Sequence, residues 1–310
     1  MKLISIVTPC YNEEENVEDL YRQVKEVFDS LEGYVYEYIF IDNASKDNTV
    51  KILKEIAKKD KNVKIIVNVR NFGHIRSPYY AFLQAKGDAI VQIFADLQEP
   101  PRIIKDFIKK WEEGYKIVIG VKNKSEENPV IFALRKLYYR LIGVLSEAEQ
   151  IKNFSGFGLY DRKFIDIMKQ LDDPYPYFRG LIADIGFERA EIEFVQQKRK
   201  KGKSHNNFYT LYDMAMLGFV NHSKAPLRMA AFIGFIMAIC SFLTAVFYFV
   251  YKIIFWNSFQ VGIAPIIIGF FFFSSIQLCF IGIIGEYIGA TYTQVRRRPL
   301  VVEKERINFD

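Results

Sequence analysis

The sequence is poor in cysteine and carries only a small excess of positive charge. Its three cysteines in 310 residues, Cys10, Cys240 and Cys279, are too few and too far apart for a disulfide framework or a cysteine-rich zinc site, which favours a reducing compartment. The 42 Lys and Arg residues exceed the 36 Asp and Glu residues by a formal charge of +6. Because nucleic-acid binding requires a concentrated basic excess, no nucleic-acid partner is expected.

Two nucleotide-binding motifs and a secretory leader are also missing. No G-x-G-x-x-G sequence follows the first apolar run and no G-x-x-x-x-G-K-[ST] sequence occurs, so a dinucleotide-binding site and a P-loop are both disfavoured. The N-terminus, MKLISIVTPCYNEE, has no long apolar core and no small-residue cleavage site, so it predicts a first strand rather than a signal peptide. With 50% hydrophobic and 25% charged residues, the chain is expected to be folded.

The C-terminal third contains two long segments without charge. Residues 229–251 include no charged side chain, and at 1.5 Å per residue a helix of this length covers roughly 34 Å. A second uncharged stretch, residues 253–285, has a polar break at Trp256-Asn257-Ser258. Each stretch is long enough to cross a hydrocarbon core of about 30 Å. The two segments therefore predict a transmembrane hairpin with both flanks on one side of the membrane.

Basic residues flank this hairpin. The connecting segment offers only Lys252, whereas cations precede and follow the hairpin at Lys198, Arg199, Lys200, Lys201, Lys203, Lys224, Arg228, Arg296, Arg297, Arg298, Lys304 and Arg306. Positively charged flanks stay on the cytoplasmic side, so the catalytic domain and both termini are expected to be cytoplasmic, at the inner (cytoplasmic) membrane. Segment 206–226 predicts an amphipathic helix, which either lies in the membrane interface or packs on the soluble domain.

The N-terminal two thirds alternate strand-like and helix-like segments. Apolar runs of strand length lie at 3–9, 36–42, 63–69, 89–94 and 116–121. Their alternation with helical stretches predicts an α/β domain with a mainly parallel sheet and helices on both faces. Such sheets bind ligands at the carboxyl ends of their strands, so the polar segments that follow the strands are the candidate functional site.

Four polar segments at these strand ends carry a resemblance to a known family. They read TPCYNEEEN, DNASKDNT, RNFGH and ADLQEPP, and the C-terminal FIGIIGEYIGATYTQVRRRP adds a further match. Together they resemble glycosyltransferase family 2, and nearly the whole chain resembles its polyprenyl-phosphate glycosyltransferase branch, the bactoprenol glucosyltransferase and dolichol-phosphate mannose synthase type. With the patterns above, the resemblance implies a GT-A (Rossmann-like) domain over 1–205, an interfacial segment at 206–226, a transmembrane hairpin at 227–293 and a basic cytoplasmic tail at 294–310.

The first two segments align with nucleotide-binding residues of the family. Pro9, Tyr11 and Glu13 stand where the family holds the base, and this set suits the role because a ring packs on a base while a carboxylate accepts from base or ribose donors. Asp42 begins the second segment, where the family commonly has two acids, and Asn43 replaces the second. An amide both donates and accepts hydrogen bonds, so the identity of the base stays open, with a UDP-sugar favoured.

The segment Asp96-Leu97-Gln98 matches the second acid and the glutamine of the family's metal-binding motif. In extended backbone, residues two apart point to the same side, so the Asp96 carboxylate and the Gln98 carbonyl are expected to hold Mg²⁺ or Mn²⁺ against a diphosphate. Phe94 stands at the position of the first acid, which removes one oxygen ligand or ribose contact. Diphosphate oxygens and waters are then left to complete the coordination.

The catalytic base of the family is replaced in this chain. When SGFGLYDR is aligned with the family segment that carries the base, Gly156 stands at the Asp position. A hydroxyl acceptor needs a base, whereas a phosphate monoester, with a second pKa of about 6, is already largely dianionic at neutral pH. The missing base therefore favours a lipid phosphate as acceptor. Asp161 and Asp184 are weak substitutes, and Asp161 is better explained as structural.

Cations are expected around the acceptor phosphate. Lys122 stands where the family has Arg, and Arg135 lies about one helix further on, so both join Asp96 and Arg199 as candidate catalytic residues.

A basic run supplies further candidates for the acceptor phosphate. Arg199 and Ser204 match an R-x-x-G-x-S element of the family, and Arg179 matches an R-G element on its acceptor side. For each lysine of this run, a lipid-attracting basic strip is an equally good interpretation.

The combined hypothesis is an inverting glycosyltransferase. It would move a single sugar from a nucleotide-diphosphate sugar to polyprenyl (undecaprenyl) phosphate at the cytoplasmic membrane face, where inversion and the lipid acceptor are implied by the resemblance. Two alternatives stay open: transfer to a hydroxyl of a lipid-linked glycan, and a catalytically silent nucleotide-sugar-binding membrane protein, prompted by Phe94 and Gly156. The partners expected are the donor, the acceptor and the bilayer, and a homo-oligomer is left open.

Overall fold

The computed structural model describes residues 1–122, 151, 153–171, 173, 175–176, 178–197, 225–255, 263–296 and 298–309. Of the residues singled out above, Arg135, Arg199 and Ser204 lie outside these ranges, as does nearly all of segment 206–226.

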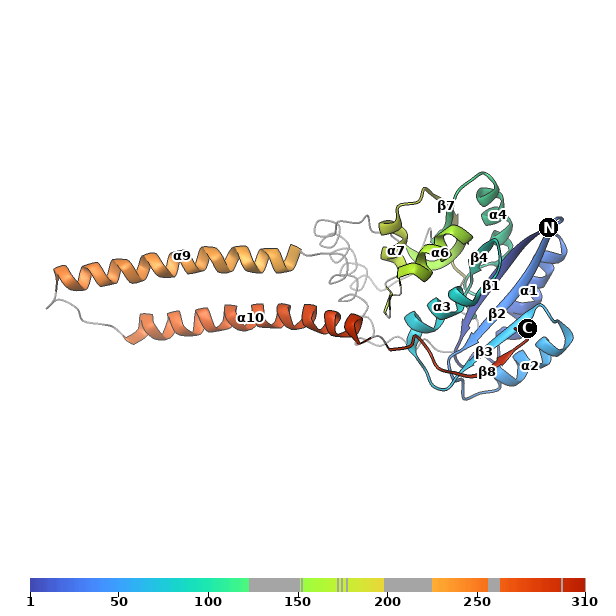
Figure 1. Ribbon diagram of the computed structural model, residues 1–310, viewed down its shortest axis with the longest axis horizontal. Helices are drawn as coiled ribbons and strands as arrows, with labels where there is room; N and C mark the ends of the chain where they lie inside the picture. Colours follow the sequence, from blue (N-terminus) through green and yellow to red (C-terminus); the bar gives the residue numbers. More distant parts are fainter. Residues whose placement is uncertain are drawn as a thin grey trace.

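One mixed sheet forms the frame of the α/β domain (Figure 1). In the described part of the chain it has eight strands in the order β7-β5-β6-β4-β1-β2-β3-β8. The strands are β1 (Lys2–Cys10), β2 (Tyr34–Asp42), β3 (Val63–Asn68), β4 (Ala89–Gln92), β5 (Ile117–Lys122), β6 (Phe154–Asp161), β7 (Arg189–Phe194) and β8 (Glu303–Ile307). Only β6 and β8 run antiparallel to their neighbours. The mainly parallel sheet predicted from the sequence is confirmed, and β6, β7 and β8 are additions to the five predicted strands.

Helices cover both faces of this sheet. One hydrophobic core lies beneath α1 (Val17–Asp29), α2 (Thr49–Lys59) and α4 (Ile104–Glu112), and α4 follows the short helix η1 (Pro101–Ile103). A second core lies beneath helices that cover the opposite face: α3 (Gly73–Gln84), α6 (Arg162–Leu171) and α7 (Phe178–Ile185).

Strand β2 shows why both faces are apolar. Its residues Tyr38 and Phe40 belong to the first core, whereas Ile39 and Ile41 belong to the second. Successive side chains of a strand point to opposite faces, so a continuous apolar run fits a strand that is covered on both sides.

Two long helices project from the α/β domain and lie side by side (Figure 1). They are α9 (Ala225–Ile254) and α10 (Ile263–Val295), and most of the large apolar side chains that the structure describes on them are exposed. Among the described residues, these are the two helices long and apolar enough to cross a membrane, with candidate spans Leu227–Thr244 and Phe272–Val295. An apolar surface of this extent is stable only when lipid or protein covers it.

The chain returns to the sheet after α10. Strand β8 pairs antiparallel with β3, and the backbone N–H of Val69 donates to the carbonyl of Val302 at 3.0 Å. A salt bridge of 2.6 Å joins Lys54 to Glu305. The sequence interpretation treated 294–310 as a basic tail, and the structure instead adds part of this segment to the α/β domain. The difference arises because the exposed strand EKERI alternates charge and offers no apolar run.

Candidate functional site

The polar segments predicted to form the site lie at the carboxyl ends of the parallel strands. Strands β1 and β2 are parallel and in register, with Cys10 opposite Asp42, so the turns that follow them are neighbours. The backbone N–H of Asn43 donates to the carbonyl of Cys10 at 2.9 Å. Pro9, at the end of β1, and Tyr11, just beyond it, are partly buried at these strand ends.

Hydrogen bonds connect the turn after β1 to the turn after β2. The N–H of Asn12 donates to Ser45 Oγ at 2.8 Å, and the Asn12 side-chain oxygen accepts from the N–H of Lys46 at 2.8 Å. The N–H of Glu13 donates to Thr49 Oγ1 at 2.9 Å. Asn12 has a positive φ of 56°, a left-handed conformation that asparagine tolerates better than most residues. The two turns therefore form one connected wall of the site.

Asp42 and Asn43 occupy different environments although they are adjacent. Asp42 is buried and accepts from the N–H of Ser45 at 2.9 Å. Burial raises its pKa, and the hydrogen bonds from Ser45 offset part of that shift.

Asn43 connects the end of β2 to the segment after β3. Its amide nitrogen donates to Asn71 Oδ1 at 2.9 Å and to the carbonyl of Gly73 at 3.0 Å. Its oxygen accepts from the N–H of Phe72 at 2.8 Å and from Asn68 Nδ2 at 3.2 Å. These contacts give Asn43 a structural role, because both amide donors are engaged within the protein.

The segment after β4 forms a tight turn rather than the extended backbone expected from the sequence. Leu97 has a φ of 57°, and the N–H of Gln98 donates back to Asp96 Oδ1 at 3.2 Å. The expected extended backbone is therefore wrong here, whereas the predicted convergence of the Asp96 and Gln98 side chains on a cation stays a prediction. Asp96 and Gln98 are both partly exposed at the edge of the sheet.

Gln98 contacts the segment that follows β7. Its N–H partner is Asp96, whereas its carbonyl accepts from the N–H of Gln197 at 3.0 Å. Its side-chain nitrogen donates to the carbonyl of Gln197 at 3.3 Å, and its side-chain oxygen accepts from Gln196 Nε2 at 3.1 Å. The predicted metal-binding turn is thus held directly against the residues that precede the basic run.

Glu99 is a candidate functional residue that the sequence analysis missed. It is 3% exposed, and its carboxylate accepts from Ser155 Oγ at 2.7 Å and from the N–H of Phe94 at 3.3 Å. Burial raises the pKa of Glu99 to about 7, and the charge of Asp96 adds to the rise, while Ser155, Phe94 and Lys122 act against it. The sequence offered one indication of this residue, because Glu99 is an acid that stands between Gln98 and the prolines Pro100 and Pro101.

Gly156, on β6, follows Ser155, the residue that bonds this buried carboxylate. Its φ is 111°, and a Cβ added there would lie 3.3 Å from Gln92 Oε1. Tyr160 Oη donates to the carbonyl of Gly156 at 2.8 Å. A side chain at this position would be strained, so the local backbone is built for glycine and not for the acid of the family pattern.

The remaining predicted residues lie on separate elements. Lys122 ends β5, where its N–H donates to the carbonyl of Asn153 at 3.1 Å, and its charge acts on Glu99. Arg179 is in the first turn of α7. Asp161 accepts from Trp111 Nε1 at 2.7 Å and forms a salt bridge of 3.2 Å with Lys116, which agrees with a structural role.

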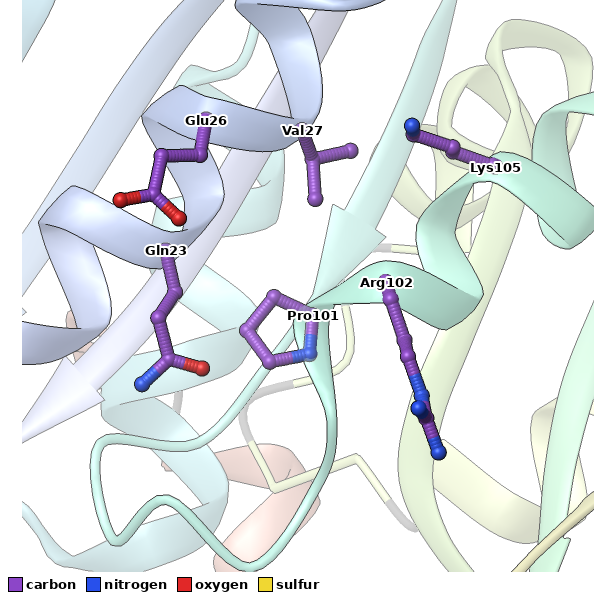
Figure 2. A pocket seen from close by; sticks show the side chains of 6 residues that line it. All are labelled: Gln23, Glu26, Val27, Pro101, Arg102 and Lys105. Carbon is purple, nitrogen blue, oxygen red and sulfur yellow. The ribbon is translucent and has the colours of Figure 1, made fainter.

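A surface hollow in the structure does not coincide with these residues. It lies between α1 on one side and η1 with the start of α4 on the other, and Figure 2 shows side chains from these elements around it. The lining residues are Gln23, Glu26, Val27, Pro101, Arg102 and Lys105. Within the described residues, no group of three or more His, Cys, Asp or Glu side chains forms a metal site, so the candidate metal ligands are one carboxylate and one amide.

Comparisons with known proteins give consistent matches. A family model described as Glycosyl transferase family 2 matches residues 5–179. The chain is 36% identical over 307 residues to an uncharacterized glycosyltransferase of Bacillus subtilis, covering 99% of this chain and 94% of that protein. It is 30% identical over 302 residues to the prophage bactoprenol glucosyl transferase homolog of Escherichia coli, covering 97% and 98%. A solved structure of glucosyl-3-phosphoglycerate synthase from Mycobacterium tuberculosis with Mn²⁺, uridine diphosphate and phosphoglyceric acid is 18% identical, with a TM-score of 0.48 over 71% of this chain and 76% of that one.

Proposed function

The chain belongs to glycosyl transferase family 2, and from this membership we propose that it transfers one sugar from a nucleotide-diphosphate sugar to polyprenyl (undecaprenyl) phosphate, with inversion at the anomeric carbon. The chain is a glycosyltransferase, so the alternative of a silent binding protein is set aside. A UDP-sugar is the favoured donor. Bactoprenol glucosyl transferases among its relatives support a polyprenyl phosphate acceptor.

One observation carries this proposal. Gln98 is bonded to Gln196 and Gln197, so the turn assigned to the donor diphosphate adjoins the start of the basic run assigned to the acceptor phosphate. Arg199 follows Gln197 by two residues in the sequence. The turn assigned to the donor diphosphate and the segment that leads to the acceptor-binding cations therefore touch each other. Direct transfer requires the two phosphates to lie this close together.

The donor is assigned to the wall formed by the turns after β1 and β2. Pro9 and Tyr11 would pack on the base, while Glu13 and Asp42 would accept hydrogen bonds from it or from the ribose. Asn43 supports this wall through its contacts with Asn71 and Gly73.

A divalent cation, Mg²⁺ or Mn²⁺, fits the oxygen ligands of the turn after β4. Among the described residues, one carboxylate oxygen of Asp96 accepts a hydrogen bond, from the N–H of Gln98. The side-chain oxygen of Gln98 accepts from Gln196 and keeps a second lone pair for a cation. Such hard oxygen ligands suit these cations. When bound, the cation supplies positive charge that stabilises the departing diphosphate.

The acceptor phosphate would attack without a protein base. One phosphate oxygen forms a bond to the anomeric carbon as the bond from that carbon to the diphosphate breaks, and the nucleoside diphosphate leaves with the electron pair. No proton has to move, which is compatible with a glycine at position 156. Cationic side chains would orient the attacking phosphate and lower its repulsion from the donor, and those assigned this role are Lys122, Arg135, Arg179 and Arg199, with Ser204 as a hydroxyl donor.

The return of the chain to the sheet supports the proposed membrane orientation. Strand β8 follows α10 and pairs with β3, so the chain returns after the hairpin to the same α/β domain that precedes α9 in the sequence. A hairpin that spans the membrane therefore places the catalytic domain and both termini on one side. The basic flanks assign that side to the cytoplasm.

A donor and acceptor panel tests the function. Purified full-length protein is incubated with Mg²⁺, labelled UDP- and GDP-sugars, and short polyprenyl phosphate, and labelled lipid is the expected product. Transfer to glycan hydroxyls alone would favour the alternative acceptor. Donor binding without any transfer would contradict the proposal.

A further inference from the structure

Two arginines flank one aromatic ring at the end of β3. The guanidinium carbon of Arg70 lies 4.0 Å from the centre of the Phe72 ring, and that of Arg76 lies 5.6 Å from the same centre. The two cationic groups are consequently no more than about 10 Å apart. The Phe72 side chain is buried, and its backbone N–H donates to the Asn43 side chain, which fixes the segment that carries the ring.

The protein bonds these arginines through backbone oxygens. Arg70 Nη1 donates to the carbonyl of Asn71 at 3.1 Å, and Arg76 Nη2 donates to the carbonyl of Pro299. Arg76 is partly buried, and its Nε is buried without a hydrogen-bond partner in the described part of the protein. Burial lowers the pKa of Arg76, and the like charge of Arg70 lowers it further. An anion bound between or beside these two arginines would offset the repulsion between their charges and could accept hydrogen bonds from their guanidinium groups.

These arginines also lie where the second long helix joins the α/β domain. Gln294, in the last turn of α10, donates from Nε2 to Asp173 Oδ1 at 2.9 Å. Pro299, the partner of Arg76, follows the end of α10 by four residues. The candidate membrane span of α10 extends to Val295. A cation attached to this connection is therefore positioned at the level of lipid headgroups.

We propose that Arg70 and Arg76 form a binding site for the phosphate group of an anionic phospholipid of the surrounding bilayer. Guanidinium groups bind phosphate oxygens through paired hydrogen bonds, and juxtamembrane cations are attracted to anionic lipid. The bound headgroup would hold the α/β domain against the membrane surface at the end of α10. The inference rests on the membrane placement in the proposed function and not on the identity of the sugar acceptor.

The test compares anionic and zwitterionic lipids. Full-length protein in neutral detergent is titrated with phosphatidylglycerol or phosphatidylcholine, and its Tm is followed. A lipid concentration of about ten times the dissociation constant is expected to raise Tm by roughly 2–3 °C with phosphatidylglycerol, and by much less with phosphatidylcholine. Arg70→Gln and Arg76→Gln are each expected to lose at least half of this shift.

Arg102→Gln is the matched control. Arg102 is an exposed arginine beside the hollow between α1 and α4 in Figure 2, outside every site assigned above. It is expected to keep the full shift. If Arg76→Gln fails to fold, Arg70→Gln still decides, because Arg70 is exposed and its hydrogen bond stays within its own turn.

Two results would overturn the inference. One is an undiminished phosphatidylglycerol shift in Arg70→Gln. The other is a pair of arginine variants that keep the Tm shift caused by phosphatidylglycerol but lose the Tm shift caused by UDP or by polyprenyl phosphate. That result would assign the arginines to a substrate. Wild-type protein that shows the arginine-dependent lipid shift but makes no lipid-linked sugar would refute the proposed function and leave this inference standing.

Discussion

The two halves of the strand-end site are built in different ways. The nucleotide half, formed by the ends of β1, β2 and β3, is closed by hydrogen bonds between turns that neighbour each other in the sheet, such as Asn12 with Ser45. The transfer half, formed by the ends of β4, β5 and β7 and the start of β6, depends on contacts of the Asp96–Glu99 turn with Ser155 and Gln196. Phe94 and Gly156, the main departures from the family pattern, both belong to the transfer half.

If the proposed assignments of the two halves are right, this difference predicts that donor binding and acceptor chemistry respond to different substitutions. The half proposed to bind the nucleotide keeps Pro9, Tyr11, Glu13 and Asp42 of the family pattern, and Asn43 is an amide in place of the second acid. The transfer half lacks a carboxylate at position 156 and has a backbone there that disfavours one. Substitutions that act on one half and spare the other are the direct way to test this separation.

The largest effect is expected for Asp96→Asn. Removing the only carboxylate assigned to the cation should lower kcat about a hundredfold or more at saturating Mg²⁺, because the departing diphosphate loses its charge stabilisation. The measurement is initial rate against Mg²⁺ concentration. Asp106→Asn, on the outer face of α4, should match wild type, and full activity in Asp96→Asn would remove the metal assignment.

A smaller loss is expected for Glu99→Ala. The change leaves Ser155 Oγ without its acceptor and opens a cavity beside Asp96, so unfolding free energy should fall by about 1–3 kcal/mol and kcat by roughly tenfold. Ser155→Ala removes the same hydrogen bond and keeps the carboxylate, so it should lower both the unfolding free energy and kcat by less. Chemical denaturation and steady-state rates give the two numbers. Equal kcat in Glu99→Ala and wild type would show that the carboxylate does not support the turn.

Gln196 and Gln197 form a matched pair for the contact between the two phosphates. Gln196 bonds Gln98 through its side chain, whereas Gln197 does so through its backbone N–H and carbonyl. Gln196→Ala should raise the KM for polyprenyl phosphate roughly fivefold, the equivalent of about 1 kcal/mol for one hydrogen bond, with the donor KM unchanged. Gln197→Ala should resemble wild type. A loss confined to the donor KM would place this contact in the nucleotide half.

The smallest effect on catalysis is expected for Glu37→Gln, which tests the frame that both halves share. Glu37 accepts from Ser5 Oγ and from the N–H of Lys86 and forms a salt bridge of 2.6 Å with Lys64. Burial by itself raises the pKa of Glu37, but these partners outweigh it and leave the pKa lowered. The substitution should reduce stability by about 1–3 kcal/mol at pH 7 without changing either KM.

The pH dependence of this effect has a definite sign. The folded-state pKa lies below the unfolded value of about 4.3, so the stabilisation is complete above that pH and is lost as pH falls through the lowered pKa. The Tm difference between wild type and Glu37→Gln should therefore shrink in acid. Lys58 also lowers the pKa of Glu55, but this pair lies at the exposed surface, where solvent screens it, so Glu55→Gln is the control with a much smaller difference of the same sign. A gap that widens in acid would contradict the assignment.

Local patterns predicted much of this molecule. Mainly apolar runs of six or seven residues identified the five strands β1 to β5, because a strand covered on both faces has no polar side to interrupt it. The same criterion missed β6, whose glycines Gly156 and Gly158 weaken the strand pattern, and β8, which is a charged edge strand. Glu99 went unassigned because its raised pKa results from burial, which the neighbouring residues in the sequence do not reveal.

The sequence by itself determined the strand-end motifs, the two uncharged helices and the absence of an acid at position 156, since each is a property of residues close together in the chain. Only the tertiary structure decided that Gln98 meets Gln196, that Ser155 binds Glu99 and that β8 completes the sheet after α10. These contacts join residues about 50 to 240 positions apart. Their formation depends on the packing of the whole α/β domain, because no short segment can bring such distant residues together against the cost of closing the intervening loops.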